Sequence, residues 1–396
     1  MANESPLIQR RRLGKSGLMV SNLGFGCMRL PIIDGNFEHI DEPTATKMVR
    51  KAIDAGVNYI DTAYPYHGPG IPLAGQSEPF VGRALSDGYR EKVYLATKLP
   101  TWVIESRADM DRYLDEQLKR LNTPYLDVYL AHSLSASRFP KLEKLGLLTF
   151  LDEAKRDGRI KNAAFSFHDT YLPFEEILNS YDWDVVQIQY NYLDVDYQAG
   201  QRGLREAHKR DIGVVIMEPL RGGFLVNNIP SDLQQELKEI RPHWTLADWG
   251  LRWLWNQPEV GVVLSGMSTM EQVEENLRIA AASPKSGKLL SNADIAALDR
   301  VRRRFTDRIA VDCTACDYCA PCPQGVRISR IFSYYNDYVI TDDQESKERA
   351  VWLYDGAMSH TERAGNCIGC AECTTKCPQN IPIPDLMPQI AKIFEG

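Results

Sequence analysis

Four polar residues follow short apolar runs in the chain: Asp61, Tyr66, Lys98 and His132. Together they could transfer a proton to or from an oxygen atom. A tyrosine has a pKa of about 10 in solution, but a lysine cation beside it stabilises the tyrosinate and makes the phenol a stronger acid. An aspartate can keep that lysine charged and in place, and a histidine can orient the oxygen through a hydrogen bond. These residue types favour a proton-transfer site, if the fold brings them together.

The cysteines form a second set of groups with potential chemistry. Of the nine, Cys27 stands alone, and the other eight lie in two runs near the C-terminus. The eight are Cys313, Cys316, Cys319, Cys322, Cys367, Cys370, Cys373 and Cys377. Clustered thiols in a reducing compartment bind metal more often than they form disulfides. Three thiols separated by two residues each, with a fourth before a proline, match iron–sulfur runs; zinc is the alternative.

The elements that must position the first set are alternating strands and helices. Stretches of helical period, such as 44–55, 106–121, 150–157 and 270–281, separate most of the short apolar runs. Eight such runs begin at Leu23, Val57, Val93, Val128, Ala163, Val185, Val214 and Val262. Continuous apolar strands between amphipathic helices indicate a parallel sheet covered on both sides. Eight units favour a closed (β/α)8 barrel; a doubly wound sheet is the rival, but no GxGxxG follows the first run.

A barrel also predicts where chemistry occurs, because catalytic groups sit at the carboxyl ends of its strands. Asp61, Lys98 and His132 end three successive apolar runs, and Tyr66 follows closely after Asp61. Taken singly, each has an ordinary structural explanation: a helix cap, a solvated lysine, a hydrogen-bonded histidine or a packed tyrosine. Taken together at the same phase of successive units, they predict one site at one mouth.

At these residues the sequence resembles the aldo-keto reductase family. Residues 61–66 read DTAYPY, similar to the family's DTAxxY signature, while 96–98 (ATK) and 130–133 (LAHS) are similar to its lysine and histidine strands. The resemblance covers residues 10 to 300. It implies an oxidoreductase that reduces a small carbonyl substrate with nicotinamide hydride. In that reading Tyr66 donates the proton, Lys98 and Asp61 adjust its acidity, and His132 positions the carbonyl.

The resemblance also implies a bound NADP or NAD. The residues it nominates are Ser166, Gln187, Met217, Pro219, Leu220, Arg221, Ser265, Gly266, Met267, Gln272, Glu275 and Asn276. Ser166 and Gln187 would meet the carboxamide. Met217 stands where many relatives carry an aromatic ring, and residues 267–269 lack the Lys or Arg that usually holds the 2′-phosphate of NADP. The choice between NADP and NAD stays open.

The cysteine-rich tail resembles a two-cluster ferredoxin domain, in which the fourth cysteine of each run binds the cluster of the other run. Carried over, one [4Fe–4S] cluster would be held by Cys313, Cys316, Cys319 and Cys377, and the other by Cys367, Cys370, Cys373 and Cys322. The first run has two residues instead of three before its last cysteine, which leaves the cross-over open. A helical-looking stretch at 343–354 predicts a mainly helical variant. We therefore expect a barrel over residues 1–305 and a ferredoxin-type domain over 306–396.

The charge composition argues against two classes of binding partner. The formal net charge of −7 and a pI near 5.6 argue against nucleic acid and anionic membrane. No apolar run is long enough to span a bilayer, and the N-terminus lacks the apolar core of a signal peptide, so we expect a cytoplasmic protein.

Three functions fit the sequence. In the first, the barrel reduces a carbonyl and the clusters are auxiliary. In the second, the clusters relay single electrons between a ferredoxin-like carrier and a substrate in the barrel. In the third, a redox-sensing module sits on a barrel that has lost its activity, which the intact set of four polar residues disfavours.

Overall fold

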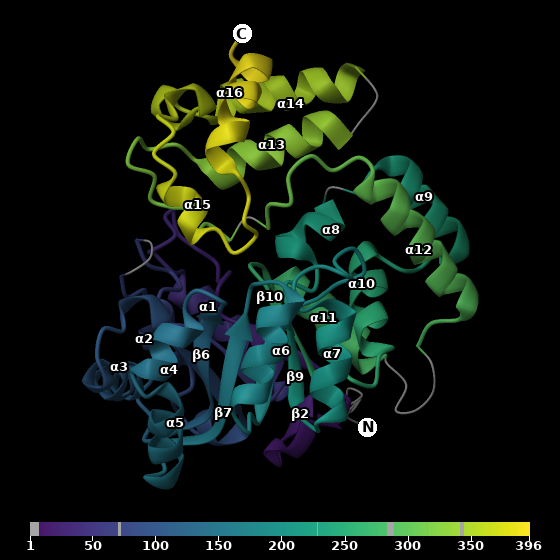
Figure 1. Ribbon diagram of the computed structural model, residues 1–396. Helices are drawn as coiled ribbons and strands as arrows, with labels where there is room; N and C mark the ends of the chain where they lie inside the picture. The colour runs from purple at the N-terminus through teal and green to yellow at the C-terminus, as the bar shows by residue number, and fades with distance from the viewer. Residues whose placement is uncertain (1–7, 70–72, 228, 283–288, 315, 341–343) are drawn as a thin grey trace. The chain divides into compact units, whose positions relative to one another are not determined.

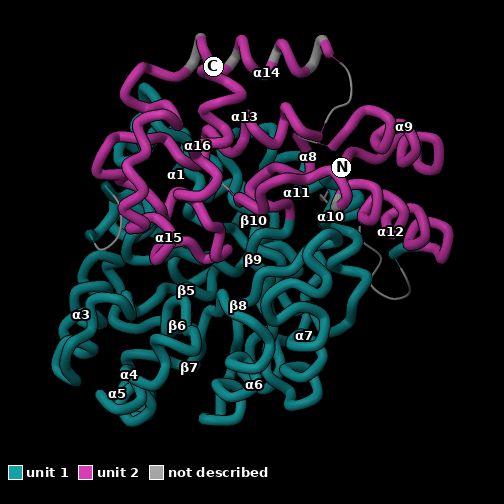
Figure 2. The backbone as a smooth tube through the Cα atoms, turned by 45° about the horizontal axis from the view of Figure 1, so that its top comes forward, with its two compact units in different colours: residues 1–219, 247–290 teal, residues 220–246, 291–396 magenta. Residues whose placement is uncertain are grey.

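The computed structural model describes residues 8–69, 73–227, 229–282, 289–314, 316–340 and 344–396, and Figure 1 labels its elements. The chain forms two compact units (Figure 2): Met1–Pro219 with Ala247–Leu290, and Leu220–Leu246 with Ser291–Gly396. The sequence placed a boundary between residues 305 and 306. That boundary stays a prediction; the second unit takes in residues 220–246 and a helix that ends at residue 306 as well as the cysteine-rich tail.

The first unit contains a closed barrel of parallel strands. Within the described residues the strand order is β10-β3-β4-β5-β6-β7-β8-β9, and the barrel closes because β10 pairs with both β3 and β9. The strands are β3 Leu23–Gly26, β4 Tyr59–Asp61, β5 Tyr94–Leu99, β6 Leu126–Leu134, β7 Ile160–Phe167, β8 Val185–Gln189, β9 Gly213–Met217 and β10 Val262–Gly266. Each apolar run of the sequence overlaps one of these strands. The predicted (β/α)8 barrel is confirmed.

Helices alternate with these strands along the chain and lie around the barrel (Figure 1). They are α1 Glu42–Asp54, α2 Ser77–Ala84, α3 Arg107–Arg120, α4 Phe139–Lys144, α5 Leu147–Arg156, α6 Tyr171–Ser180, α7 Gly200–Lys209, α10 Leu246–Trp255 and α11 Met270–Ala281. Local sequence explains where they begin. Asp41 caps α1 by accepting a hydrogen bond from the Thr44 N–H, and Ser106 and Asp109 cap α3 reciprocally.

A two-stranded hairpin, β1 (Arg10–Arg12) and β2 (Met19–Ser21), precedes the barrel. Its Leu13 and Val20 belong to the apolar cluster that fills the barrel interior. A Cβ on Gly213, the first residue of β9, would lie 2.6 Å from the Leu13 side chain, so glycine is needed for this close approach. The hairpin therefore packs at the end of the barrel where the strands begin, opposite their carboxyl ends.

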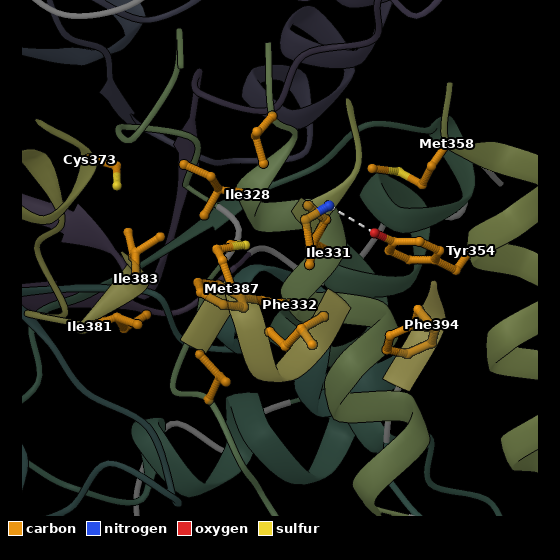
Figure 3. Packing of buried hydrophobic residues seen from close by; sticks show 14 of the residues in the cluster. Ile328, Ile331, Phe332, Tyr354, Met358, Cys373, Ile381, Ile383, Met387 and Phe394 are labelled. Atoms are coloured by element: carbon orange, nitrogen blue, oxygen red, sulfur yellow. Dashed lines mark hydrogen bonds between the residues drawn. The ribbon is translucent and has the colours of Figure 1, made fainter. Parts of the chain in front are cut away.

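The second unit is helical, as the sequence predicted for the tail. Its helices are α8 Phe224–Asn227, α9 Ser231–Ile240, α12 Asn292–Thr306, α13 Ile328–Ile340, α14 Gln344–Ala357, α15 Glu372–Lys376 and α16 Ile383–Phe394. Figure 3 shows the apolar core of the tail, in which Phe332 of α13, Tyr354 of α14 and Phe394 of α16 lie close together. The Tyr354 and Phe394 rings stack with centroids 4.6 Å apart. Across the described ranges, no helix has the length and apolar character needed to cross a membrane.

Candidate active site and cysteine ligands

Three of the four predicted residues meet at the carboxyl ends of β4 and β5. These strands are neighbours, with Asp61 of β4 opposite Ala96 of β5. The Lys98 Nζ donates hydrogen bonds to Asp61 Oδ1 at 2.7 Å and to the Thr62 carbonyl at 2.8 Å, and it lies 3.3 Å from the Tyr66 Oη. All three side chains are buried. The structure thus places an ammonium between a carboxylate and a phenol.

The charges of this group depend on one another. Burial lowers the pKa of Lys98, and the carboxylate of Asp61 opposes that shift. Burial likewise raises the pKa of Asp61, and the Lys98 ammonium opposes it. Each charge is stabilised in the barrel interior mainly by the other, because a buried ion without a partner is costly. The second carboxylate oxygen of Asp61 is buried and has no hydrogen-bond partner among the described residues.

His132 joins the group from β6. It lies within an irregularity in the pairing of β6 with β7, between Ala131 and Leu134, where Ser133 has a positive φ of 52°. The His132 ring lies 6.3 Å from the Tyr66 ring and 5.0 Å from the Trp102 ring, measured between centroids. Burial, and then the charge of Lys98, lower the pKa of His132 well below its ordinary value. The imidazole is neutral at neutral pH and has one N–H to donate.

A backbone clamp holds the loop that carries Tyr66. The N–H of Gly75 donates to the Tyr64 carbonyl at 2.8 Å, and the N–H of Ser77 donates to the Tyr66 carbonyl at 3.1 Å. A Cβ on Gly75 would lie 1.9 Å from the Tyr66 carbonyl oxygen, so only glycine permits this approach. Two backbone hydrogen bonds therefore join the two ends of the loop that carries the Tyr66 phenol.

The residues nominated for the nicotinamide end lie on neighbouring strands. Ser166 of β7 pairs in register with Gln187 of β8. The Ser166 hydroxyl accepts a hydrogen bond from the Ser133 N–H at 2.8 Å, and the Gln187 amide nitrogen lies 3.6 Å from the Met217 sulfur. The Gln187 side-chain carbonyl is buried and has no hydrogen-bond partner among the described residues. An orphaned acceptor of this kind fits a ligand amide such as the nicotinamide carboxamide.

The residues nominated for the adenosine end gather where β10 meets α11. Asn276 donates to the Ser265 hydroxyl at 3.0 Å, and the Gln272 side-chain carbonyl accepts from the Ser268 N–H at 2.7 Å. Met267, which lies between Ser265 and Gln272 in the sequence, is buried. Gly266 is the last residue of β10, and Glu275 lies 4.0 Å from Arg278 on the exposed side of α11.

Three further nominated residues lie in the turn after β9. Pro219 is the last residue of the first segment of the first unit, whereas Leu220 and Arg221 belong to the second unit. The buried Arg221 forms an ion pair with Asp312 at 2.9 Å, just before the first cysteine. Arg221 and Asp312 lie far apart in the sequence, so the sequence motif at this turn did not predict their ion pair.

Two side chains that lie beside His132 are not among the predicted site residues, although the sequence does show one of them, His168, at the end of an apolar run. Trp102 packs beside His132. His168 follows β7 directly, and its positive charge is one of the smaller causes that lower the pKa of His132. The pKa of His168 is lowered to about 4, chiefly by burial. The position of His168 at the end of a strand is a usable signal in the sequence, whereas Trp102 lies in the turn Thr101–Val103 after β5 and carries no such signal.

The cysteines of the tail fall into two neighbourhoods. Burial raises the pKa of Cys319, and the cysteines that raise it further are Cys316, Cys313 and Cys377. A second neighbourhood surrounds a cavity whose cysteine lining is Cys319, Cys322, Cys367, Cys370 and Cys373. Cys377, the last cysteine of the second run, thus lies close enough to Cys319 to raise its pKa, and Cys322, the last of the first run, shares a cavity with Cys367, Cys370 and Cys373.

These neighbourhoods fit iron–sulfur clusters. Burial and the neighbouring cysteines raise the pKa of the Cys319 thiol, so a thiolate at this position needs a metal centre to compensate its charge. A [4Fe–4S] cluster takes four thiolates, one on each of its four irons.

Comparison with known proteins defines the class. The model of the Aldo/keto reductase family matches residues 22–302, and the model of a 4Fe-4S dicluster domain matches residues 312–381. The chain belongs to the aldo/keto reductase family, and it is an oxidoreductase with a C-terminal ferredoxin-type 4Fe-4S domain. The family and enzyme class inferred from the sequence motifs are confirmed.

Individual relatives match the barrel part of the chain. An uncharacterized oxidoreductase of Bacillus subtilis, YqkF, is 26% identical over 305 residues, 69% of this chain and 92% of the relative. The L-glyceraldehyde 3-phosphate reductase of Escherichia coli K12 is 25% identical and covers 72% of this chain and 92% of its own length. The solved aldo-keto reductase AKR11C1 of Bacillus halodurans, in its holo form, is 26% identical, with a TM-score of 0.60 over 74% of this chain and 96% of its own.

Proposed function

We propose that the chain reduces the carbonyl group of a small substrate with hydride from NADP or NAD, and that Tyr66 donates the proton. The contact between the Lys98 ammonium and the Tyr66 phenol, 3.3 Å apart, carries this proposal. An adjacent cation stabilises the phenolate left after proton transfer, so it makes the phenol a competent acid near neutral pH. Asp61 keeps that cation charged in a buried site.

His132 has a different role in this proposal. Its imidazole is neutral and can donate an N–H to the substrate oxygen while Tyr66 delivers the proton to the same atom. A neutral imidazole orients the substrate oxygen through a hydrogen bond. Because it carries no charge, it leaves the pKa of the Tyr66 phenol to be set by Lys98. Trp102, whose ring packs against His132, restricts how that imidazole turns.

The cofactor supplies the hydride when it is bound. Gln187 and Ser166 would hold its carboxamide, and the buried orphaned carbonyl of Gln187 supports this assignment. Ser265, Gln272 and Asn276 would line the adenosine end, where α11 begins with an N-cap at Thr269. The remaining predicted residues of the first unit, Met217, Pro219, Gly266, Met267 and Glu275, complete the proposed contact set; Leu220 and Arg221, which the resemblance also implies, belong to the second unit.

Replacement of the phenol tests the proposal. Tyr66→Phe should lower the rate of carbonyl reduction by on the order of 10²–10⁴-fold, measured over a panel of small aldehydes and ketones with NADPH and NADH. Tyr64→Phe is the matched control, because Tyr64 lies in the same loop and is equally buried. A wild-type rate in Tyr66→Phe would remove this residue from the mechanism.

We further propose two [4Fe–4S] clusters with crossed ligands. Cys313, Cys316, Cys319 and Cys377 would hold one, and Cys367, Cys370, Cys373 and Cys322 the other. The two cysteine neighbourhoods support this pairing. Thiolate clusters of this kind persist in a reducing compartment, which fits the cytoplasm.

The metal content checks the cluster assignment. Protein purified without oxygen should carry about eight irons and eight sulfides per chain, and Cys370→Ala should lose roughly half of them. Zinc in place of iron in the anaerobic preparation would contradict the assignment.

A second candidate function is favoured by the 4Fe-4S domain itself. Nicotinamide cofactors exchange two electrons as hydride, whereas iron–sulfur clusters exchange one, so the clusters would serve a ferredoxin-like carrier rather than the hydride step. Reducing the clusters anaerobically with dithionite and then adding a carbonyl substrate without nicotinamide separates the two. Reoxidation of the clusters by the substrate supports the relay, and clusters that stay reduced support an auxiliary role beside carbonyl reduction.

A further inference from the structure

Behind the proposed catalytic group lies a buried carboxylate that the mechanism does not use. Glu78 is the second residue of α2 and is fully buried. Its Oε1 accepts hydrogen bonds from the Thr97 hydroxyl at 2.6 Å and from the Gln117 amide at 2.6 Å. Its Oε2 accepts from the Arg120 Nε at 2.9 Å. Three donors converge on one carboxylate inside the protein.

The donors connect Glu78 to the strand that carries Lys98. Thr97 is the neighbour of Lys98 in β5, and the Gln117 amide also donates to the Lys98 carbonyl at 2.9 Å. The Tyr129 hydroxyl donates to the other end of the Gln117 amide at 2.8 Å, which fixes its orientation. The Thr97 side chain is therefore bound directly to this carboxylate, and the Lys98 carbonyl is connected to it through Gln117.

The same carboxylate is also connected to the loop that carries Tyr66. Arg120 donates a second hydrogen bond to the Gly75 carbonyl, and Gly75 and Ser77 hold the Tyr64 and Tyr66 carbonyls. The Ser77 hydroxyl adds contacts to the Thr62 hydroxyl and the Cys27 carbonyl. Glu78 follows Ser77 directly, so it links the tyrosine loop to the lysine strand.

We propose that Glu78, together with Arg120, is a positioning residue that sets the separation of the Lys98 ammonium from the Tyr66 phenol. This inference rests on the proposed function, since the separation matters only if the phenol transfers a proton. An ammonium acts on a phenol through a short contact, and a displacement of about 1 Å in such a group can cost 10²-fold in rate. Glu78 touches neither the phenol nor the ammonium and acts through the backbone that presents them.

Glu78→Gln tests the proposal, because it keeps the shape but turns an amide toward Arg120. We expect kcat to fall by about 10- to 100-fold, while KM for the nicotinamide cofactor stays within about twofold. Reduction needs the protonated phenol, so activity falls as the pH rises through phenol ionisation. With the Lys98 ammonium displaced, the phenolate is less stabilised and the pKa of the phenol rises. The fall in activity at alkaline pH, which is the alkaline limb of the pH–rate profile, should therefore move to higher pH.

Asp248→Asn is the matched control. Asp248 is also fully buried and binds Arg252 at 3.0 Å and Arg278 at 2.7 Å, in α10 and α11 of the same unit. It should lower the thermal stability without moving the alkaline limb. If Glu78→Gln does not fold, Thr97→Val removes one donor without leaving a buried charge unpaired, and it should shift the limb in the same direction.

A substrate-free measurement separates this inference from the proposed function. The ultraviolet absorbance change on ionisation of Tyr66 is the difference between a protein and its Tyr66→Phe counterpart, and it should move to higher pH in Glu78→Gln. If the wild type reduces no carbonyl in the panel, the proposed function fails, and a moved titration still upholds the positioning role. If folded Glu78→Gln or Thr97→Val shows the wild-type titration of Tyr66 and the wild-type alkaline limb, the positioning role is overturned.

Discussion

His67 shows how a single buried residue makes stability depend on pH. Its Nε2 accepts a hydrogen bond from the Leu30 N–H at 3.2 Å, and its Nδ1 lies 2.7 Å from the Phe37 carbonyl. An imidazole that accepts through one nitrogen and donates through the other is neutral. Burial lowers its pKa to about 4, and the Phe37 carbonyl partly opposes the shift.

This arrangement predicts a loss of stability on acidification. The unfolded chain binds a proton at His67 below a pH of about 6.5, whereas the folded chain does not until about pH 4, so the unfolded state gains as the pH falls between them. The contribution lost by pH 5 is about 2 kcal/mol. In His67→Gln, whose amide can replace both hydrogen bonds, urea unfolding should show a pH dependence smaller by that amount. An equal dependence in both proteins would contradict the neutral imidazole.

At the scale of elements, Tyr354 joins α14 to the segment before the second cysteine run. Its hydroxyl accepts a hydrogen bond from the Ala364 N–H at 2.9 Å, as Figure 3 shows, and donates to Glu395 at 2.5 Å. Ala364 is buried, so its N–H would have no access to water if the phenol oxygen were removed. The contact fixes the backbone just before Cys367.

Tyr354→Phe should therefore destabilise the tail by about 1–3 kcal/mol, the cost of leaving a buried N–H unpaired. Amide hydrogen exchange at Ala364 reports the change directly and should become faster. Tyr334→Phe, whose ring packs edge-on against Tyr354 and which keeps the Ala364 contact, is the control. Unchanged exchange at Ala364 in Tyr354→Phe would show that the hydroxyl does not hold this segment.

At the scale of the molecule, removal of the tail tests how far the barrel is independent. Residues 1–305 retain every barrel strand, and they keep the Arg300–Glu236 ion pair, 2.7 Å long, between α12 and α9. A closed barrel buries its own core, so we expect this fragment to fold, as judged by circular dichroism and a cooperative melt. If the clusters are auxiliary, it should reduce carbonyls at nearly the wild-type rate. A folded fragment without activity would instead favour an obligatory electron relay.

Much of the site was accessible from the sequence because parallel strands in a barrel end at one mouth. Asp61 and Lys98 lie at the same phase of successive units, so their contact follows from the strand order alone. The spacing of the cysteines similarly predicts that each run supplies ligands, since three thiols separated by two residues each match iron–sulfur runs. Both predictions depend on the spacing of residues along the chain, which the sequence alone shows.

Other features were decided only by tertiary structure. Glu78 resembles any acidic residue near a helix start until α2 packs against β5 and α3 and brings Thr97, Gln117 and Arg120 around it. Arg221 lies in a turn whose motif suggested a cofactor contact, yet it pairs with Asp312 far along the chain. Such contacts depend on how helices rotate and loops fold back over long sequence separations. Many sequences satisfy the same periodicity, so the pattern of apolar residues specifies the strands and their ends but not these partners.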